Sequence, residues 1–230
     1  MLEIDLIRHV KVDGKAALYG RTDVKPLANE NSLLLHYLLN QQKTVACYHG
    51  VACSPLKRCA VIANEFSALA QLPLTVIDHF QEMDFGFYDG KAFDELAFEN
   101  STNEGDLAGN WSVLEAFFQA PASHQLPQGE QLVCFHTRVI QAWQKLINQQ
   151  MPLTTQQKQP RRLVVMAHGG VIRMIIAHIL ELDWRQASWY QQLSIGHASL
   201  SRISIRQFDA HDKSAQQIHQ QVNIIGMPTF

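Results

Sequence analysis

Two short apolar segments of strand length, far apart in the chain, each end abruptly in a histidine. Residues 2–7 run into His9, and residues 163–167 run into His168. In an open α/β sheet, ligands bind in the crevice at the carboxyl ends of the strands. One histidine at such a position is usually structural. Two in matched settings, the first beside Arg8 and the second before a glycine pair that opens a helix, indicate a site for an anion.

The rest of the chain alternates between strand and helix patterns. We expect further strands at residues 51–53 and 74–80, helices at about 31–40, 56–72, 130–149 and 170–182, a polar connection at 151–162, and a closing hairpin of residues 198–205 and 218–225. This alternation predicts an α/β fold, a layered α/β/α sandwich with a mainly parallel sheet. We expect one domain over residues 1–230, with a helical insertion at about 81–129 that covers the crevice.

Composition narrows the class of partner. The chain is 47% hydrophobic, which is enough for a sizeable core, and its formal net charge of −2 gives no basic field for nucleic acid or an anionic membrane. The most apolar long segment, residues 171–182, contains Arg173 and His178 and fits a buried helix better than a membrane span. We therefore expect neither nucleic acid nor membrane as a partner, and the oligomeric state stays open.

The cysteine pattern favours a cytoplasmic protein without a metal site. None of the four cysteines forms a Cys-x-x-Cys pair or has a histidine at zinc-finger spacing. Glu3 and Asp5 interrupt the first apolar run where the basic n-region of a secretory signal would belong. We expect all four to be reduced and buried. They are Cys47, Cys53, Cys59 and Cys134.

Four ordered blocks resemble the motifs of the histidine phosphatase superfamily, the phosphoglycerate-mutase-like group. The blocks are Arg8-His9-Val10, Ser54 to Cys59, Glu82 through Gly90, and His168-Gly169-Gly170. They span roughly residues 2–206. The resemblance implies a phosphoglycerate-mutase-like fold and a phosphomonoesterase that works through a phosphohistidine, needs no cofactor, and acts on a small phosphorylated metabolite.

Phosphoryl transfer explains the basic residues in these blocks. The transition state spreads negative charge over three equatorial oxygens, and without a metal, fixed cations and N–H groups must hold that charge. A guanidinium is always charged and binds oxygens in pairs, so Arg8 and Arg58 are the expected phosphate clamps. The start of the helix at Gly169 is expected to add backbone N–H groups. The alternative for Arg58 is a solvated arginine at a helix start.

The remaining blocks imply the acid–base chemistry. His9 is the expected nucleophile, with its other ring nitrogen donating to a backbone carbonyl in the following loop. His168 is expected to stay protonated and to donate to the transferring phosphoryl group. Glu82 is the expected general acid and base, which protonates the leaving alkoxide and then deprotonates water. The alternatives are that Glu82 is a solvated loop acid and that Asp84 takes the acid role.

The first block departs from the family pattern. Val10 replaces the family's glycine, and we expect it either to narrow the pocket or to shift the loop backbone. Lys11 and its neighbours replace the usual Glu-Thr-x-x-Asn, which puts one phosphate contact in doubt. Lys11 either substitutes as a donor or, as we prefer, faces solvent.

Two further patterns resemble the α-ribazole phosphatase branch, which removes the 5′-phosphate of α-ribazole phosphate in late cobalamin assembly. They are residues 19–24, and Pro127-x-Gly129-Glu130 followed by Phe135 and Arg138. Arg21 either contacts the substrate or pairs with Asp23. The alternatives are a broad-specificity phosphatase, a non-catalytic phosphometabolite-binding protein and, least favoured, a phosphoglycerate mutase, because residues 83–90 lack the mutases' arginine block.

The aromatic residues of the predicted insertion have two possible places. They either line a substrate pocket or fill a small core, and the second is the commoner use of such residues. The set comprises Phe85, Phe87, Tyr88, Phe93, Phe98, Trp111, Phe117 and Phe118.

Overall fold

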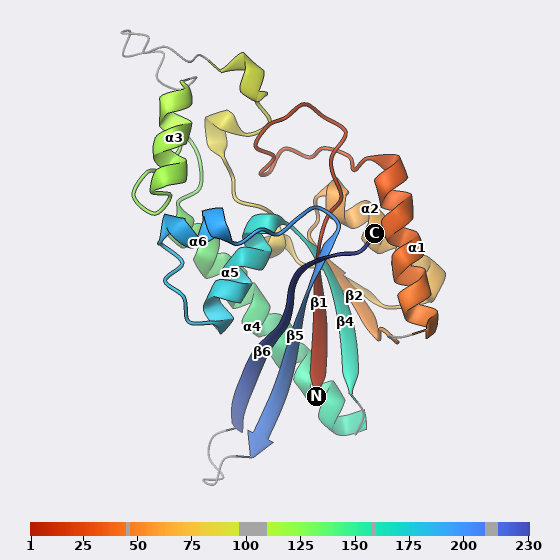
Figure 1. Cartoon of the computed structure of the whole chain (residues 1–230). Helices are drawn as coiled ribbons and strands as arrows, with labels where there is room; N and C mark the ends of the chain where they lie inside the picture. The colour runs from red at the N-terminus through yellow and green to blue at the C-terminus, as the bar shows by residue number, and fades with distance from the viewer. Residues whose placement is uncertain (45–46, 97–109, 158–159, 210–215) are drawn as a thin grey trace.

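The computed structural model describes residues 1–44, 47–96, 110–157, 160–209 and 216–230 (Figure 1). Its described strands form one sheet in the order β3-β2-β4-β1-β5-β6. Their bounds are β1 (Leu2–Arg8), β2 (Gly50–Cys53), β3 (Leu74–Val76), β4 (Arg161–Ala167), β5 (Ser199–Asp209) and β6 (Gln216–Pro228). The pairs β1–β4, β4–β2 and β2–β3 are parallel, whereas β5 and β6 add on in antiparallel fashion. The prediction of a mainly parallel α/β sheet is confirmed.

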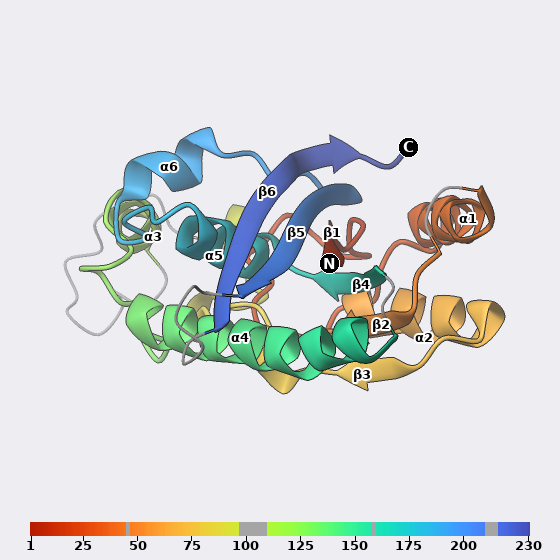
Figure 2. The same cartoon turned by 90° about the horizontal axis from the view of Figure 1, so that it is seen from below.

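Helices cover both faces of the sheet (Figure 2). Helices α1 (Ala28–Thr44) and α2 (Lys57–Ala70) lie on one face, and α4 (Leu132–Gln157) and α5 (Gly169–Ile179) lie on the other. The remaining elements are α3 (Trp111–Gln119), α6 (Ala187–Gln192) and the 3₁₀ helices η1 (Asp78–Phe80), η2 (Gly86–Tyr88) and η3 (Phe93–Glu95). Of these, α3 lies at the end of the molecule toward which β1 and β4 run (Figure 1).

The sequence of strand β1 explains why the sheet lies between two layers of helices. Leu2, Ile4 and Leu6 are buried in the core beneath α4 and α5. Ile7, of opposite parity, is buried in the second core, beneath α1 and α2. Because successive side chains of a strand point to opposite faces, a strand that is buried on both faces is mostly apolar at both parities. The exception in β1 is Asp5, which is fully buried and forms ion pairs with Arg162 and Arg202. Strand β1 therefore lies in the middle of the molecule, and its end at Arg8 meets the site.

Two predicted elements differ from the structure. The expected connection at 151–162 is wrong, because α4 continues through Pro152 to Gln157. Met151 and Thr154 are buried on this last part of the helix, and their packing outweighs the cost of the proline. The expected strand at 74–80 ends at Val76, and the chain turns into η1, where the N–H of Phe80 bonds to the carbonyl of Ile77. The predicted closing hairpin is confirmed, with longer strands.

The expectation for the cysteines is partly wrong. All four are free thiols, but Cys47 and Cys134 are exposed, whereas Cys53 and Cys59 are buried. Cys134 lies on the outward side of α4, where a small thiol carries no packing penalty. Among the described helices, none is long and apolar enough to cross a membrane.

Candidate active site

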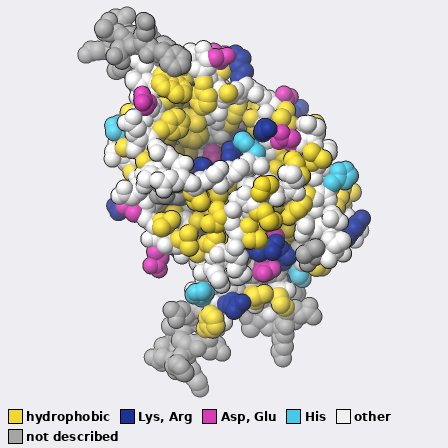
Figure 3. Space-filling view, viewed as in Figure 1, with side chains coloured by type: hydrophobic (Ala, Val, Ile, Leu, Met, Phe, Trp, Pro, Cys, Tyr) yellow, Lys and Arg dark blue, Asp and Glu magenta, His cyan; other side chains and the backbone are white. Residues whose placement is uncertain are grey.

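The two strand-end histidines lie side by side. Arg8 pairs with Ala167 at the matching ends of β1 and β4, and the N–H of His9 donates to the carbonyl of Ala167 at 3.0 Å. The rings of His9 and His168 meet edge-on with their centroids 5.2 Å apart. A cavity of about 800 Å³ opens here. Figure 3 shows basic, acidic and histidine side chains within this hollow and hydrophobic side chains along its border.

His9 is held in one tautomer. Its Nδ1 lies 2.6 Å from the carbonyl oxygen of Val10, which can only accept a hydrogen bond, so Nδ1 carries the proton and Nε2 does not. Burial, followed by the charge of Arg58, lowers the pKa of His9 well below its ordinary value. A neutral imidazole with a free Nε2 lone pair is the form that can attack an electrophile. The predicted bond to a carbonyl in the following loop is confirmed.

His168 is fully buried and differs from its prediction. Its Nδ1 accepts from Nε of Arg58 at 3.2 Å, so Nε2 carries the proton and donates to Oγ of Ser54 at 2.8 Å. Burial, and then the charge of Arg58, lowers the pKa of His168 well below its ordinary value. These bonds and the lowered pKa favour a neutral ring, which differs from the expectation of a protonated His168, and its donation to a phosphoryl group stays a prediction.

Arg58 is also fully buried, so the alternative of a solvated arginine is wrong. Besides its bond to His168, the guanidinium donates to the carbonyl of Thr22 at 2.9 Å, of Tyr19 at 2.9 Å and of Gly20 at 2.5 Å. Arg58 therefore ties the 19–22 turn to His168. It does not line the cavity, and its direct contact with phosphate stays a prediction.

Arg8 lines the cavity and has an unused donor. One of its terminal nitrogens donates to the carbonyl of Ile195 at 2.5 Å, and the other lies 3.0 Å from Nε2 of His197. Its Nε is buried and has no partner. A Cβ at Gly169 would lie only 3.3 Å from that Nε, so the glycine lets the guanidinium approach the backbone. A buried charged donor without an acceptor is costly unless a ligand supplies one.

Glu82 lies at the N-terminus of α5. Its Oε2 accepts from the N–H of Gly170 at 2.9 Å, and a Cβ at Gly170 would collide with its carboxylate. Glu82 lines the cavity, so it is not the solvated loop acid of the alternative reading. Asp84 does not line the cavity and accepts from the N–H of Gly86 at 2.8 Å.

The turn at residues 20–23 has a structural role, because it connects two of the motif blocks. The Asp89 carboxylate accepts the N–H groups of Gly20, Arg21 and Thr22 at 3.1, 2.7 and 3.0 Å. A Cβ at Gly20 would collide with the carbonyl of Met83. The pattern that resembles a substrate-specific branch therefore joins two motif blocks, since Arg58 takes the carbonyls of the same turn.

Arg21 is exposed and outside the cavity lining. It pairs with Asp84 at 3.5 Å, and Asp23 pairs with Lys57 at 3.2 Å. The alternative in which Arg21 pairs with Asp23 is therefore wrong. Contact between Arg21 and a substrate stays a prediction without structural support.

The two departures in the first block have different outcomes. Val10 is fully buried in the core beneath α1 and α2 and is not part of the cavity lining, so it does not narrow the pocket. Lys11 is exposed, as preferred, but it also lines the cavity, and its Nζ lies 3.4 Å from the carboxylate of Glu30.

Three basic residues of the cavity wall, Lys15, Arg173 and His197, were not expected from the sequence. Arg173 lines the cavity from α5 and donates to the carbonyl of Leu193 at 3.2 Å. The His197 ring lies 5.4 Å from that of His9, and partial desolvation at the cavity wall, followed by the charge of Arg8, lowers its pKa. His197 comes just before β5, which runs antiparallel to β1, so its position at the start of a strand was the signal available.

Three of the predicted aromatic residues line the pocket, and two of these, Phe85 and Phe117, also pack in or against the core. Phe85, Phe117 and Phe118 line the cavity, together with Phe135 and Met174. The others pack in or against the core, except Phe98, which lies outside the described residues. The core group comprises Tyr88, Phe87, Phe93 and Trp111. The cavity thus has a basic end at Arg8 and an apolar, aromatic wall.

Comparisons with known proteins agree with this geometry. The family model of the histidine phosphatase superfamily (branch 1) matches residues 4–211. A probable phosphatase of Schizosaccharomyces pombe is 27% identical over 183 residues, covering 78% of this chain and 74% of that protein. The adenosylcobalamin/alpha-ribazole phosphatase of Escherichia coli is 24% identical over 196 residues, covering 83% and 85%. The structure of a mycobacterial glucosyl-3-phosphoglycerate phosphatase aligns with a TM-score of 0.71 at 18% identity, over 98% and 99% of the two chains.

Proposed function

We propose that this phosphatase, which belongs to the histidine phosphatase superfamily, hydrolyses phosphomonoesters through a phosphohistidine on His9. The observation that carries the proposal is the pairing of two groups in one cavity wall. His9 is a neutral imidazole with Nε2 free of a proton, and beside it the buried Nε of Arg8 lacks an acceptor. A nucleophile next to an unsatisfied cation fits a phosphoryl group.

The reaction has two steps. Nε2 of His9 attacks phosphorus, the P–O ester bond breaks, and Glu82, which enters this step as the carboxylic acid, gives its proton to the departing alkoxide. Water then attacks the phosphohistidine, the P–N bond breaks, and Glu82 takes the water's proton, which releases inorganic phosphate. Arg8 and the backbone N–H of Gly169, at the start of α5, hold the charge on the phosphoryl oxygens. The Val10 carbonyl stabilises the positive charge that the His9 ring gains.

Turnover of a generic aryl phosphate tests this function against that of a non-catalytic binding protein. We expect purified wild-type protein to hydrolyse nitrophenyl phosphate and His9→Ala to be inactive. His124→Ala, which changes an exposed histidine, should match the wild type. Absence of turnover in the wild type, with phosphate still binding, would support the non-catalytic alternative. The replacement of the family's glycine by Val10 does not support the non-catalytic alternative, because Val10 is buried in the core.

For the substrate we propose a nucleoside-type phosphomonoester, with α-ribazole 5′-phosphate first. The support is the aromatic wall of a cavity of about 800 Å³, which is far larger than a phosphate needs, and the name of the Escherichia coli relative. A base stacked on Phe85, Phe117 or Phe118 gains about 1–3 kcal/mol, or about ten- to a hundredfold in affinity. The turn at residues 20–23 does not support this choice of substrate, because its hydrogen bonds connect motif blocks to one another.

The second candidate is a broad-specificity phosphatase that binds only the phosphate group of its substrates. The exposed Lys11 and Lys15 on the cavity lining favour this candidate, because they attract many anionic metabolites. Steady-state kcat/KM for α-ribazole phosphate, a simple ribose phosphate and phosphoglycerate separates the two. We expect α-ribazole phosphate to be preferred by about tenfold or more. Values within a few-fold of one another would favour the broad phosphatase.

A further inference from the structure

Arg138 on α4 binds the backbone of the segment that carries Glu82. One terminal nitrogen of its guanidinium donates to the carbonyls of His79 and Gln81, both at 2.8 Å. The other donates to the carbonyl of Glu82 itself at 3.0 Å. One side chain thus holds three carbonyls within four residues of the chain.

Glu130 orients this guanidinium and holds the same segment from its other end. Its carboxylate accepts from Arg138 in a two-pronged pair, at 2.7 Å from Nε and 2.8 Å from a terminal nitrogen. Both side chains are largely buried, with exposures of 13% and 11%, so the pair is weakly screened by solvent. The N–H of Glu130 donates to the carbonyl of Asp84 at 2.8 Å, and the N–H of Asp84 donates back to its carboxylate at 3.3 Å.

The loop before Glu130 is also locked to the motif that follows Glu82. The N–H of Phe87 donates to the carbonyl of Pro127 at 2.9 Å. Gly86 has a φ of +55°, and a Cβ there would collide with the backbone of Pro127 and Gly129. The proposed reaction gives no role to the pattern Pro127-x-Gly129-Glu130 with Arg138. The contacts above show that this pattern supports the backbone of the Glu82 segment.

We propose that Arg138, oriented by Glu130, is a positioning residue that sets the place of the Glu82 carboxylate in the cavity. Arg138 does not line the cavity, so it acts through Glu82. It fixes the carbonyl of Glu82, while the N–H of Gly170 fixes the carboxylate. The inference rests on the proposed acid–base role of Glu82. A displacement of a reacting group by about 1 Å can cost about 10²-fold in rate.

A leaving-group comparison tests this inference. We would measure kcat/KM for an alkyl phosphate and for nitrophenyl phosphate in the wild type, Glu82→Gln, Arg138→Met and the double variant. Nitrophenolate leaves without help from an acid, so its rate reports the rest of the site. We expect Arg138→Met to slow the alkyl phosphate by about 10²-fold and nitrophenyl phosphate by less than about tenfold. The double variant should be no slower on the alkyl phosphate than Glu82→Gln, because both changes remove one function.

Two further variants make the test specific. Arg138→Lys should recover part of the alkyl phosphate rate, since an ammonium can still donate to the carbonyls but cannot form the two-pronged pair. Arg185→Met removes an exposed arginine that pairs with Asp183 and should keep the wild-type ratio of the two substrates. If Arg138→Met does not fold, the ratio in Arg138→Lys decides, and an unchanged ratio there would overturn the inference.

The contradicting outcomes are distinct. Equal loss on both substrates in Arg138→Met, or effects of Arg138→Met and Glu82→Gln that multiply in the double variant, would overturn the positioning role while leaving the proposed function intact. Equal loss on both substrates in Glu82→Gln would instead show that Glu82 is not the acid. The proposed acid role and the inference would then fall together.

Discussion

At the first turn of α5, Gly170 provides the room in which Glu82 sits. A Cβ there would collide with the carboxylate, so Gly170→Ala should displace Glu82 and lower kcat/KM for an alkyl phosphate by about 10²-fold. Gly196→Ala is the matched control, because a Cβ at Gly196 would have nothing within 4 Å. Steady-state kinetics checks both, and an unimpaired Gly170→Ala would mean that Glu82 works from another position.

The residues at the strand ends could be predicted, but their partners could not. Arg8 and His9 follow from an apolar run that stops at two polar residues with phosphate chemistry. The neutral state of His168 does not follow, because it depends on a bond from Arg58, which lies 110 positions away in the chain, and on complete burial. Direct phosphate contact by Arg58 is likewise expected from its motif alone. The carbonyls of residues 19–22 that bond to its guanidinium come from another part of the chain, so the motif around Arg58 does not reveal them.

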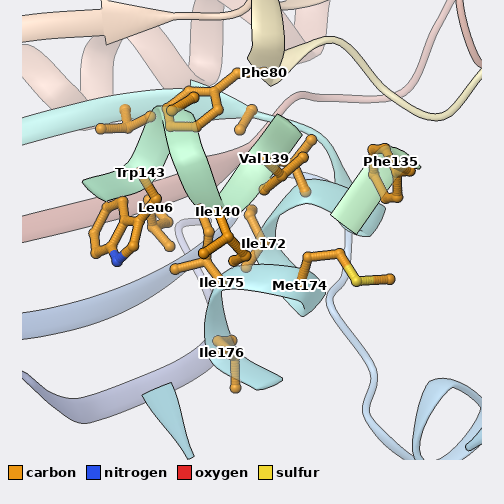
Figure 4. Close-up of a cluster of buried hydrophobic side chains, with 14 of the residues drawn as sticks. Leu6, Phe80, Phe135, Val139, Ile140, Trp143, Ile172, Met174, Ile175 and Ile176 are labelled. Atoms are coloured by element: carbon orange, nitrogen blue, oxygen red, sulfur yellow. The ribbon is translucent and has the colours of Figure 1, made fainter. Parts of the chain in front are cut away.

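At the scale of elements, the packing of α4 on α5 supports the N-terminal end of α5 and hence the site. Figure 4 shows Trp143 of α4 in one cluster with Ile172 and Ile175 of α5. Trp143 is fully buried, and its indole N–H donates to Oε1 of Gln220 on β6 at 2.8 Å. Trp143→Ala should therefore lower the free energy of unfolding by about 3–5 kcal/mol.

Denaturant unfolding measures this loss. Val133→Ala, on the same helix with 49% of the valine exposed, is the control and should change stability by less than about 0.5 kcal/mol. Similar losses in the two variants would contradict the placement of Trp143 at the centre of this core. The periodicity of residues 130–149 predicted the helix and its buried face, but not the extension past Pro152, which depends on tertiary packing.

At the scale of the whole molecule, two buried neutral histidines link stability to pH. The pKa values of His9 and His168 lie well below the ordinary 6.5, so below that pH the unfolded chain binds protons that the folded chain does not. The free energy of unfolding must then fall as the pH falls, by at most about 1.4 kcal/mol per pH unit for each histidine. His168→Gln should show a shallower fall between pH 7 and 5, measured by denaturant unfolding, and an unchanged slope would contradict the assignment.

The charge balance of the cavity gives a second prediction for the whole enzyme. Arg8 and Arg173 line the cavity, and their guanidinium groups supply the positive charge that phosphoryl transfer needs. We therefore expect full activity after exhaustive chelation, measured on an aryl phosphate. Loss of activity that added magnesium restores would contradict this expectation.

The central claim is that His9 carries the phosphoryl group, and trapping that intermediate tests it most directly. After incubation with a labelled phosphate donor and rapid quenching, the wild type and His124→Ala should carry label that acid releases and alkali does not. His9→Ala should carry none. Label of the same stability on His9→Ala would contradict the account and place the nucleophile elsewhere.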